Sequence, residues 1–166
     1  MAIRNILNIE DETLSKRSRE VKNFDERLHI LLDDLAETMR ASSGVGLAAP
    51  QVGVLRRAAV IEISDGALTE IVNPEIISSE GSQSSCEGCL SLPGVYGMVE
   101  RPMSVEVKAY DRYGKEFHIT GDGFMARALC HEIDHLDGKL FTRLVTEYID
   151  SENREKESET DCGETI

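Results

Sequence analysis

The sequence predicts an α+β fold in which antiparallel β-sheets pack around one central helix. Two pairs of strand-like segments, 58–63 with 68–73 and 105–110 with 115–120, flank short turns and indicate β-hairpins. Apolar residues recur at helical spacing over 121–138. The chain has no strand–helix–strand repeat, which favours antiparallel over parallel sheets.

The first helix is predicted over residues 25–41, after an extended arm of residues 1–22. Asn23 or Asp25 can cap it, because both side chains accept hydrogen bonds from a helix N-terminus. The small residues that follow, GVGLAAPQ at 44–51, let the backbone run close to a ligand or another strand. Taken alone, such a turn indicates close packing rather than a site.

The middle of the chain is predicted to consist of strands and loops. The first hairpin turns at 64–66, and Asn73 and Pro74 end its second strand, because proline restricts the residue before it. A third strand can start at 75–77. The polar, glycine-containing stretch 78–88 is predicted to be a loop.

The helix of residues 121–138, with Asp122 as a candidate cap and Gly138 as its end, carries the sequence HEIDH at 131–135. Two histidines four residues apart lie on one helix face and can bind one metal ion together. Glu132 lies about one hundred degrees round the helix, close enough to take a proton from a water beside that ion. This helix is therefore predicted to be the metal-binding helix of a hydrolase.

A hydrolytic metal site usually has three protein ligands and one open position, so a third ligand is needed. Phe141 stands where the zinc signature of the metzincins has its third histidine, and a phenyl ring cannot bind a metal. The glutamates from Glu147 onward lie in a short polar tail, with too little sequence for the second lobe of a thermolysin-like enzyme. Cys89, within EGCLS at 87–91, offers a thiolate that suits zinc or ferrous iron.

Three motifs, GVGLAAPQ at 44–51, EGCLS at 87–91 and HEIDH at 131–135, resemble the signature motifs of the bacterial peptide deformylases, in the same order. The resemblance extends from about Gly44 to Phe141. It implies a metal-dependent hydrolase that removes the formyl group from the N-terminal formylmethionine of newly made proteins and releases formate. The HExxH sequence by itself also allows another metallopeptidase, which would cleave internal peptide bonds.

The resemblance implies that Cys89, His131 and His135 bind one divalent metal ion. A thiolate with two imidazoles suits both Zn²⁺ and Fe²⁺. The resemblance favours Fe²⁺ as the native ion, with Ni²⁺ or Co²⁺ as working substitutes. A structural metal ion, which would only stabilise the fold, would need a closed site with Cys86 or Cys130 as the fourth ligand. A catalytic site leaves one coordination position of the metal open for water, whereas a purely structural site does not.

Catalytic roles also follow from the resemblance. Glu132 would act as the general base and then protonate the departing amine, while the Gln51 side-chain amide and the Leu90 backbone N–H would donate to the oxyanion. Glu87 and Arg101 can pair and so hold the cysteine motif in place. The residues expected to border the substrate are Val45, Gly46 and Glu87.

The four cysteines are predicted to be thiols. The sequence has no signal segment and no apolar run long enough to span a membrane, so the protein is expected in the cytoplasm, where disulfides are rare. Cys86 and Cys89 form a CxxC pair, but a structural zinc site would need a second pair at suitable spacing. Neither Cys130 nor Cys162 provides one.

The length of 166 residues suits one catalytic domain, predicted over 1–148, followed by a flexible tail over 149–166. Eight acidic residues lie between 147 and 166, and the net charge of −13 argues against a nucleic-acid site. In some deformylases a basic C-terminal helix meets the ribosome; the acidic tail departs from that pattern, so a transient ribosome contact stays open. The expected partners are N-formylmethionyl nascent peptides, bound by a monomer.

Overall fold

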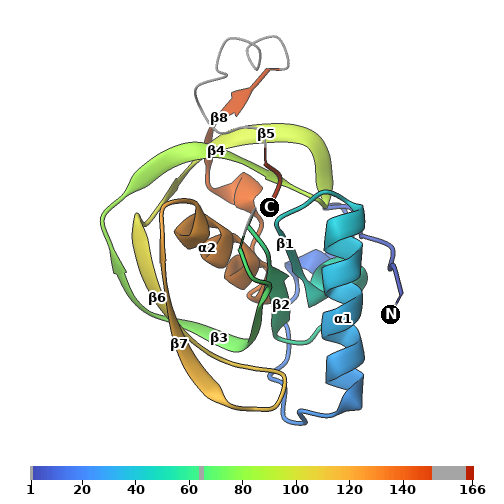
Figure 1. Cartoon of the computed structure of the whole chain (residues 1–166). Helices are drawn as coiled ribbons and strands as arrows, with labels where there is room; N and C mark the ends of the chain where they lie inside the picture. The colour runs from blue at the N-terminus through green and yellow to red at the C-terminus, as the bar shows by residue number, and fades with distance from the viewer. Residues whose placement is uncertain (1, 64–65, 151–163) are drawn as a thin grey trace.

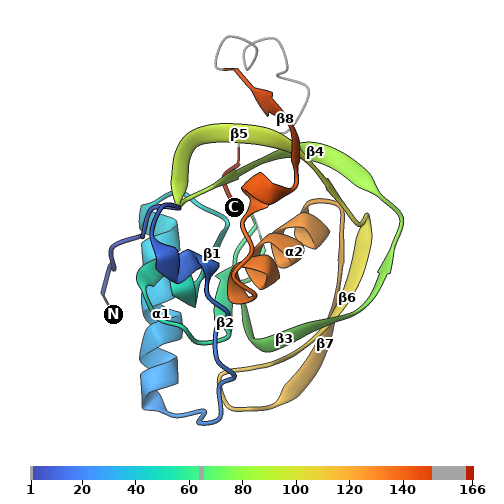
Figure 2. The ribbon, with the colours of Figure 1, turned by 180° about the vertical axis from the view of Figure 1, so that it is seen from behind.

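The computed structural model describes most of the chain, namely residues 2–63, 66–150 and 164–166. This part contains two β-sheets and two α-helices, α1 (Glu26–Ala41) and α2 (Phe124–Leu136). Figures 1 and 2 show α2 enclosed by long, curved strands, whereas α1 lies on the outside beside β1 (Gly46–Ala48) and β2 (Ala58–Ile61). The predicted α+β class with antiparallel sheets is confirmed.

The larger sheet has five strands in the order β1-β2-β3-β6-β7, and every neighbouring pair is antiparallel. Its remaining strands are β3 (Thr69–Glu80), β6 (Ser104–Tyr110) and β7 (Glu116–Asp122). The smaller sheet, in the order β4-β5-β8, consists of β4 (Gln83–Cys89), β5 (Leu92–Arg101) and β8 (Val145–Ile149). Both predicted hairpins are confirmed, because β2 pairs with β3 and β6 pairs with β7.

The predicted strand end at Asn73 and the predicted loop at 78–88 are both wrong. β3 continues past Asn73 to Glu80, and a register shift between Val72 and Glu75 accommodates the proline between them. The stretch 78–88 forms the end of β3 and most of β4, so the cysteine motif lies on a strand. The last six residues of β3 are exposed and carry no apolar alternation that would mark a strand.

The helix caps agree with the sequence in one case and differ in the other. The Asp25 carboxylate accepts a hydrogen bond of 3.1 Å from the Leu28 N–H, which confirms the predicted cap of α1. Asp122 does not cap α2; it ends β7 opposite Ser104, and Gly123 takes the cap position with a φ of +57°. Sheet pairing therefore overrides the local capping preference of Asp122.

α2 is fixed by apolar packing against the larger sheet. Its residues Ala126, Leu129 and Ile133 belong to one buried cluster with Val105 and Val107 of β6. A second cluster fills the space between α1 and the first strands of the same sheet. The helix that carries the two histidines is thus held on its apolar side by the core.

The predicted tail of residues 149–166 differs along its length. Ile149 ends β8, and residues 151–163 lie outside the described residues. Ile166 is buried and belongs to the same core cluster as α2. Within the described ranges, no α-helix has the length and apolarity that crossing a bilayer requires.

Candidate metal centre

Two elements bring three potential metal ligands together. Cys89 ends β4, and His131 and His135 lie one turn apart on α2. One ligand atom from each side chain lies within 4.8 Å of the others, and all three residues are about 1% exposed. Cys89 Sγ is 3.3 Å from His135 Nε2. The three side chains form a compact, buried donor set.

His131 is oriented by a buried carboxylate. Its Nδ1 lies 2.6 Å from Glu87 Oε1 and donates a hydrogen bond to it, and its Nε2 is buried with no hydrogen-bond partner among the described residues. A carboxylate on one ring nitrogen is the usual way in which proteins aim the other nitrogen at a metal. Phe141 packs beside this imidazole, with the ring centres 5.8 Å apart.

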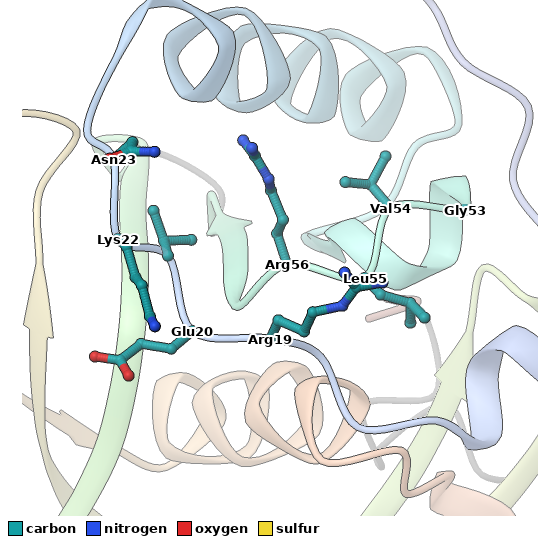
Figure 3. Close-up of a pocket in the computed structure, with 9 residues that line it drawn as sticks. Arg19, Glu20, Lys22, Asn23, Gly53, Val54, Leu55 and Arg56 are labelled. Carbon is teal, nitrogen blue, oxygen red and sulfur yellow. The ribbon is translucent and has the colours of Figure 1, made fainter.

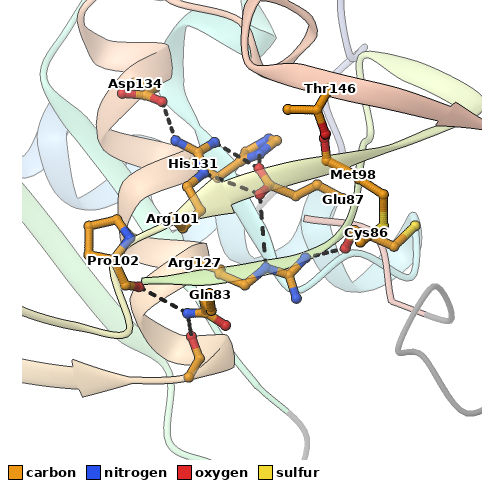
Figure 4. A network of polar contacts seen from close by, with 11 residues as sticks. Gln83, Cys86, Glu87, Met98, Arg101, Pro102, Arg127, His131, Asp134 and Thr146 are labelled. Atoms are coloured by element: carbon orange, nitrogen blue, oxygen red, sulfur yellow. Dashed lines mark hydrogen bonds and ion pairs between the residues drawn. The ribbon is translucent and has the colours of Figure 1, made fainter. Parts of the chain in front are cut away.

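Glu87 is part of a buried ion network, which Figure 4 shows along β4, β5 and α2. Arg101 on β5 donates to both Glu87 oxygens, at 2.8 and 3.2 Å, and to Asp134 at 2.6 Å. Burial alone would raise the pKa of Glu87, but the contacts with His131 and Arg101 outweigh it and lower the pKa to about 2. The carboxylate therefore stays ionised, and the pairing of Glu87 with Arg101 expected from the sequence is present.

Glu132 is the buried carboxylate next to His131 on α2. It is fully buried, and both of its carboxylate oxygens lack a hydrogen-bond partner among the described residues. Burial raises its pKa to about 7, which is the range in which a carboxylate can both take and return a proton near neutrality. A Cβ added at Gly46 would lie 2.5 Å from Glu132 Oε1, so the β1 backbone directly adjoins this carboxylate.

Gln51 lies beside the cysteine. It belongs to η2 (Ala49–Val52), and its Oε1 accepts a hydrogen bond from the Ala48 N–H at 3.0 Å. Its Nε2 donates to Ser91 Oγ at 3.1 Å and to Cys89 Sγ at 3.6 Å. The amide is thus locked in one orientation, with its N–H groups toward the donor set.

The Leu90 N–H, the predicted main-chain oxyanion donor, and the N–H of Val45, a predicted substrate neighbour, are both engaged. The Val45 N–H donates to the carbonyl oxygen of Thr165 at 3.0 Å, and the Leu90 N–H donates to the main-chain oxygen of Ile166 at 3.3 Å. A hollow of about 310 Å³ opens beside Cys89 and Leu90. Leu90 and Thr165, the acceptor of the Val45 bond, both line this hollow.

Glu87 occupies a different place from the one expected from the sequence. It is 1% exposed, and both of its oxygens are used by His131 and Arg101, which leaves no face toward a substrate. His131 and Arg101 lie 44 and 14 positions away from it, so only the folded register of β4 brings these groups together. Sequence reasoning also missed Asp134 and Phe141 as neighbours of the histidines; their positions within and just after HEIDH were the available signal.

The cysteines separate into two kinds. Cys89 and Cys130 are free thiols, as predicted. Cys86 is disulfide-bonded, so the thiol prediction is wrong for this residue, and Cys162 lies outside the described residues. Among the residues that the structure describes, the metal-competent group contains Cys89 and the two histidines but neither Cys86 nor Cys130. The closed four-ligand site that a structural metal ion would need is therefore not formed among the described residues.

Another hollow lies away from these residues, between the N-terminal arm and the segment that leads into β2. It has a volume of about 470 Å³, and Figure 3 shows Arg19, Lys22 and Arg56 among its lining residues. None of the site residues predicted from the sequence contributes to it. The chemistry expected from the three motifs is therefore confined to the α2 centre.

Comparisons with known proteins agree with one another. The family model described as polypeptide deformylase matches residues 3–152. A peptide deformylase of Caldicellulosiruptor bescii is 56% identical over 156 residues, which cover 94% of this chain and 93% of that protein. One from Acetivibrio thermocellus is 54% identical over 159 residues, covering 96% and 93%. The crystal structure of a peptide deformylase from Legionella pneumophila is 48% identical, has a TM-score of 0.84, and matches over 93% of this chain and 90% of that one.

Proposed function

The chain belongs to the polypeptide deformylase family, and we propose that Cys89, His131 and His135 bind its catalytic metal ion. The protein is a peptide deformylase, which removes the formyl group from the N-terminus of newly made peptides. The observation that carries the proposed ligand set is the convergence of three buried donor atoms within 4.8 Å. The unpartnered Nε2 of His131 supports it, since a buried polar atom without a partner is costly unless something binds it.

The donor set fits a divalent first-row ion. A thiolate with two imidazoles suits Fe²⁺, Zn²⁺, Ni²⁺ and Co²⁺, and we expect Fe²⁺ in the cell. When bound, such an ion acts as a Lewis acid that polarises a carbonyl group and makes water more acidic. Three protein ligands leave a coordination position for that chemistry.

Glu132 is the proposed general base. It takes a proton from the water that attacks the formyl carbon, and it then gives this proton to the peptide nitrogen as the carbon–nitrogen bond breaks, releasing formate and a free amine. Its raised pKa of about 7 and its two unpartnered oxygens support this role. The Gln51 side-chain amide and the Leu90 N–H are the proposed donors to the oxyanion.

Glu87 is a positioning residue in this proposal and does not border the substrate. By holding Nδ1 of His131 it aims the opposite nitrogen at the ion, and Arg101 holds Glu87 in turn. Val45 and Gly46 are the proposed substrate edge, along which an extended N-formylmethionyl peptide adds as a strand. A cytoplasmic monomer remains our prediction, and a ribosome contact remains untested.

The test is formate release from an N-formylmethionyl tripeptide by protein loaded anaerobically with Fe²⁺, compared with Glu132→Gln loaded in the same way. We expect release by the wild type, and loss of at least about two orders of magnitude in the variant with its metal content unchanged. Normal turnover by Glu132→Gln would refute the base assignment. Cleavage of internal peptide bonds without formate release would favour a different metallopeptidase.

A further inference from the structure

Residues 164–166 lie extended between Gly44 and Val45, at the proposed substrate edge, and the end of β4, a space that we call the candidate substrate groove. We refer to these three residues as the C-terminal strand. Thr165 makes a parallel bridge with Gly44, and its carbonyl oxygen accepts a hydrogen bond from the Val45 N–H. Ile166 donates to the Gly88 carbonyl at 3.2 Å and accepts from the Leu90 N–H at 3.3 Å. Both whole-chain views show the end marked C close to β1 (Figures 1 and 2). Residues 164–166 therefore bridge the edge that precedes β1 and the end of β4.

The side chains of this strand are also engaged. Ile166 is 1% exposed and belongs to the core cluster that contains Val45, Leu129 and Ile133. Leu129 and Ile133 lie on α2, the helix that also carries the two histidines. The Thr165 hydroxyl lies 3.1 Å from the hydroxyl of Tyr96. The segment is thus anchored by a buried aliphatic side chain as well as by its main chain, which is how extended peptides are recognised by sheet edges.

This strand uses the groups that the proposed reaction needs. The Leu90 N–H is the proposed oxyanion donor, and the Val45 N–H belongs to the proposed substrate edge, yet both donate to residues 165 and 166. The two Ile166 main-chain bonds flank Cys89, a proposed metal ligand. An N-formylmethionyl peptide cannot use these donors until the strand leaves.

We propose that residues 164–166 act as a tethered competitive inhibitor of the deformylase site. The proposal rests on the proposed function, because it concerns access to the same site. A tethered strand has an effective concentration that dilution of the protein does not lower, so the occupied fraction is a fixed property of the molecule. Because substrate and strand exclude each other, the strand raises KM and leaves kcat unchanged.

The test compares Ile166→Asp with the matched control Ile166→Val in the Fe²⁺-loaded enzyme. If the strand fills the groove in nine molecules of ten, the apparent KM of the wild type and of Ile166→Val lies about tenfold above that of Ile166→Asp, at equal kcat. Added Glu-Thr-Ile peptide should inhibit Ile166→Asp competitively. A KM ratio below about two would overturn the proposal.

A second variant, which lacks residues 164–166, guards against a folding defect caused by the new charge and should show the same fall in KM. Hydrogen exchange at the Val45 and Leu90 amides provides a readout that does not depend on activity. Both amides should be protected in the wild type and exchange faster in both variants. Unchanged exchange would show that the strand does not occupy the groove, whereas faster exchange without any formate release would place the failure in the proposed function.

Discussion

Glu87 Oε1 lies 2.6 Å from Nδ1 of His131, and both residues are almost completely buried. Glu87 stands two positions before Cys89 on β4, so one strand supplies both a proposed ligand and the carboxylate that orients another ligand. Arg101 completes the arrangement by neutralising the carboxylate from β5. The geometry of the donor set is therefore set by how β4 docks against α2.

Replacing this carboxylate should weaken metal binding without removing a ligand. We expect Glu87→Gln to lower metal affinity by about 10- to 100-fold, because His131 loses the charge that fixes its orientation. Titration against a competing chelator measures this change. The exposed carboxylate of Glu80 provides the control variant Glu80→Gln, for which no change is expected. Equal affinities in the two variants would show that Glu87 does not position His131.

A methyl group at Gly46 should displace the proposed base. In Gly46→Ala the new Cβ would meet Glu132 Oε1 at 2.5 Å and its Cδ at 2.9 Å, so the carboxylate must move. We expect kcat to fall by at least about tenfold, because general-base catalysis depends on hydrogen-bond distance. Metal content and thermal midpoint, measured on the same samples, should stay close to the wild type. Retention of full kcat would mean that Glu132 need not occupy its present position.

Removing the Gln51 amide should affect turnover more than substrate binding. We expect Gln51→Leu to reduce kcat by about 10²- to 10³-fold, as the loss of one oxyanion donor does in other hydrolases. Ser91→Ala is the matched control, since it removes the hydroxyl that accepts from Gln51 Nε2 but keeps the amide. Steady-state kinetics at equal metal content distinguishes the two. A similar loss in both variants would point to a structural role for this bond.

Asp34 should make stability depend on pH in the acid range. Burial would raise its pKa, but hydrogen bonds from the Ala2 N–H and from Arg4 outweigh it and lower the pKa. The stabilisation is therefore complete above the ordinary aspartate pKa of about 3.9 and is lost as the pH falls through the lowered value in the folded state. We expect Asp34→Asn to reduce the free energy of unfolding by about 1–2 kcal/mol at pH 7.

Urea unfolding between pH 7 and pH 3 checks this prediction. The gap between the wild type and Asp34→Asn should shrink as the pH falls below about 4, because Asp34 then takes up a proton in the unfolded chain, and it should close as the pH passes the lowered pKa of the folded state. Glu20→Gln, at an exposed position, should track the wild type throughout. A gap of constant size at every pH would assign the effect to packing rather than to charge.

Local patterns predicted those parts of the fold that depend on near neighbours. Apolar residues repeat about every 3.6 positions in α1 and about every 2 positions in the strands of the two hairpins. These repeats involve only residues close together in the sequence, so they can be recognised without the fold. β4 could not be predicted in this way, because Ser84 and Ser85 are polar and its place depends on pairing with β5. The same holds for Asp122, whose local preference for capping yields to the β6–β7 ladder.

In the candidate site too, the sequence predicted the features that depend on local spacing but not those that depend on contacts between distant residues. The pairing of His131 with His135 is visible in the sequence because it depends only on helical spacing. The role of Glu87 is not visible, because it depends on a contact across 44 positions, and the resemblance to a family supplied a residue set without this geometry. The position of Ile166 in the groove could not be predicted either, since a charged, polar sequence precedes it.

The wide separation of the proposed ligands along the chain would couple metal binding to folding. Cys89 and His135 are 46 positions apart and meet only when β4 docks on α2, whereas the two histidines can still chelate weakly in an unfolded chain. An ion held by these three side chains would therefore bind the native state far more tightly than the unfolded ensemble. At a free-ion concentration one hundred times the dissociation constant, this difference adds about 2.7 kcal/mol to the free energy of unfolding. A chelator would thus lower the melting temperature of the enzyme while it removes the activity.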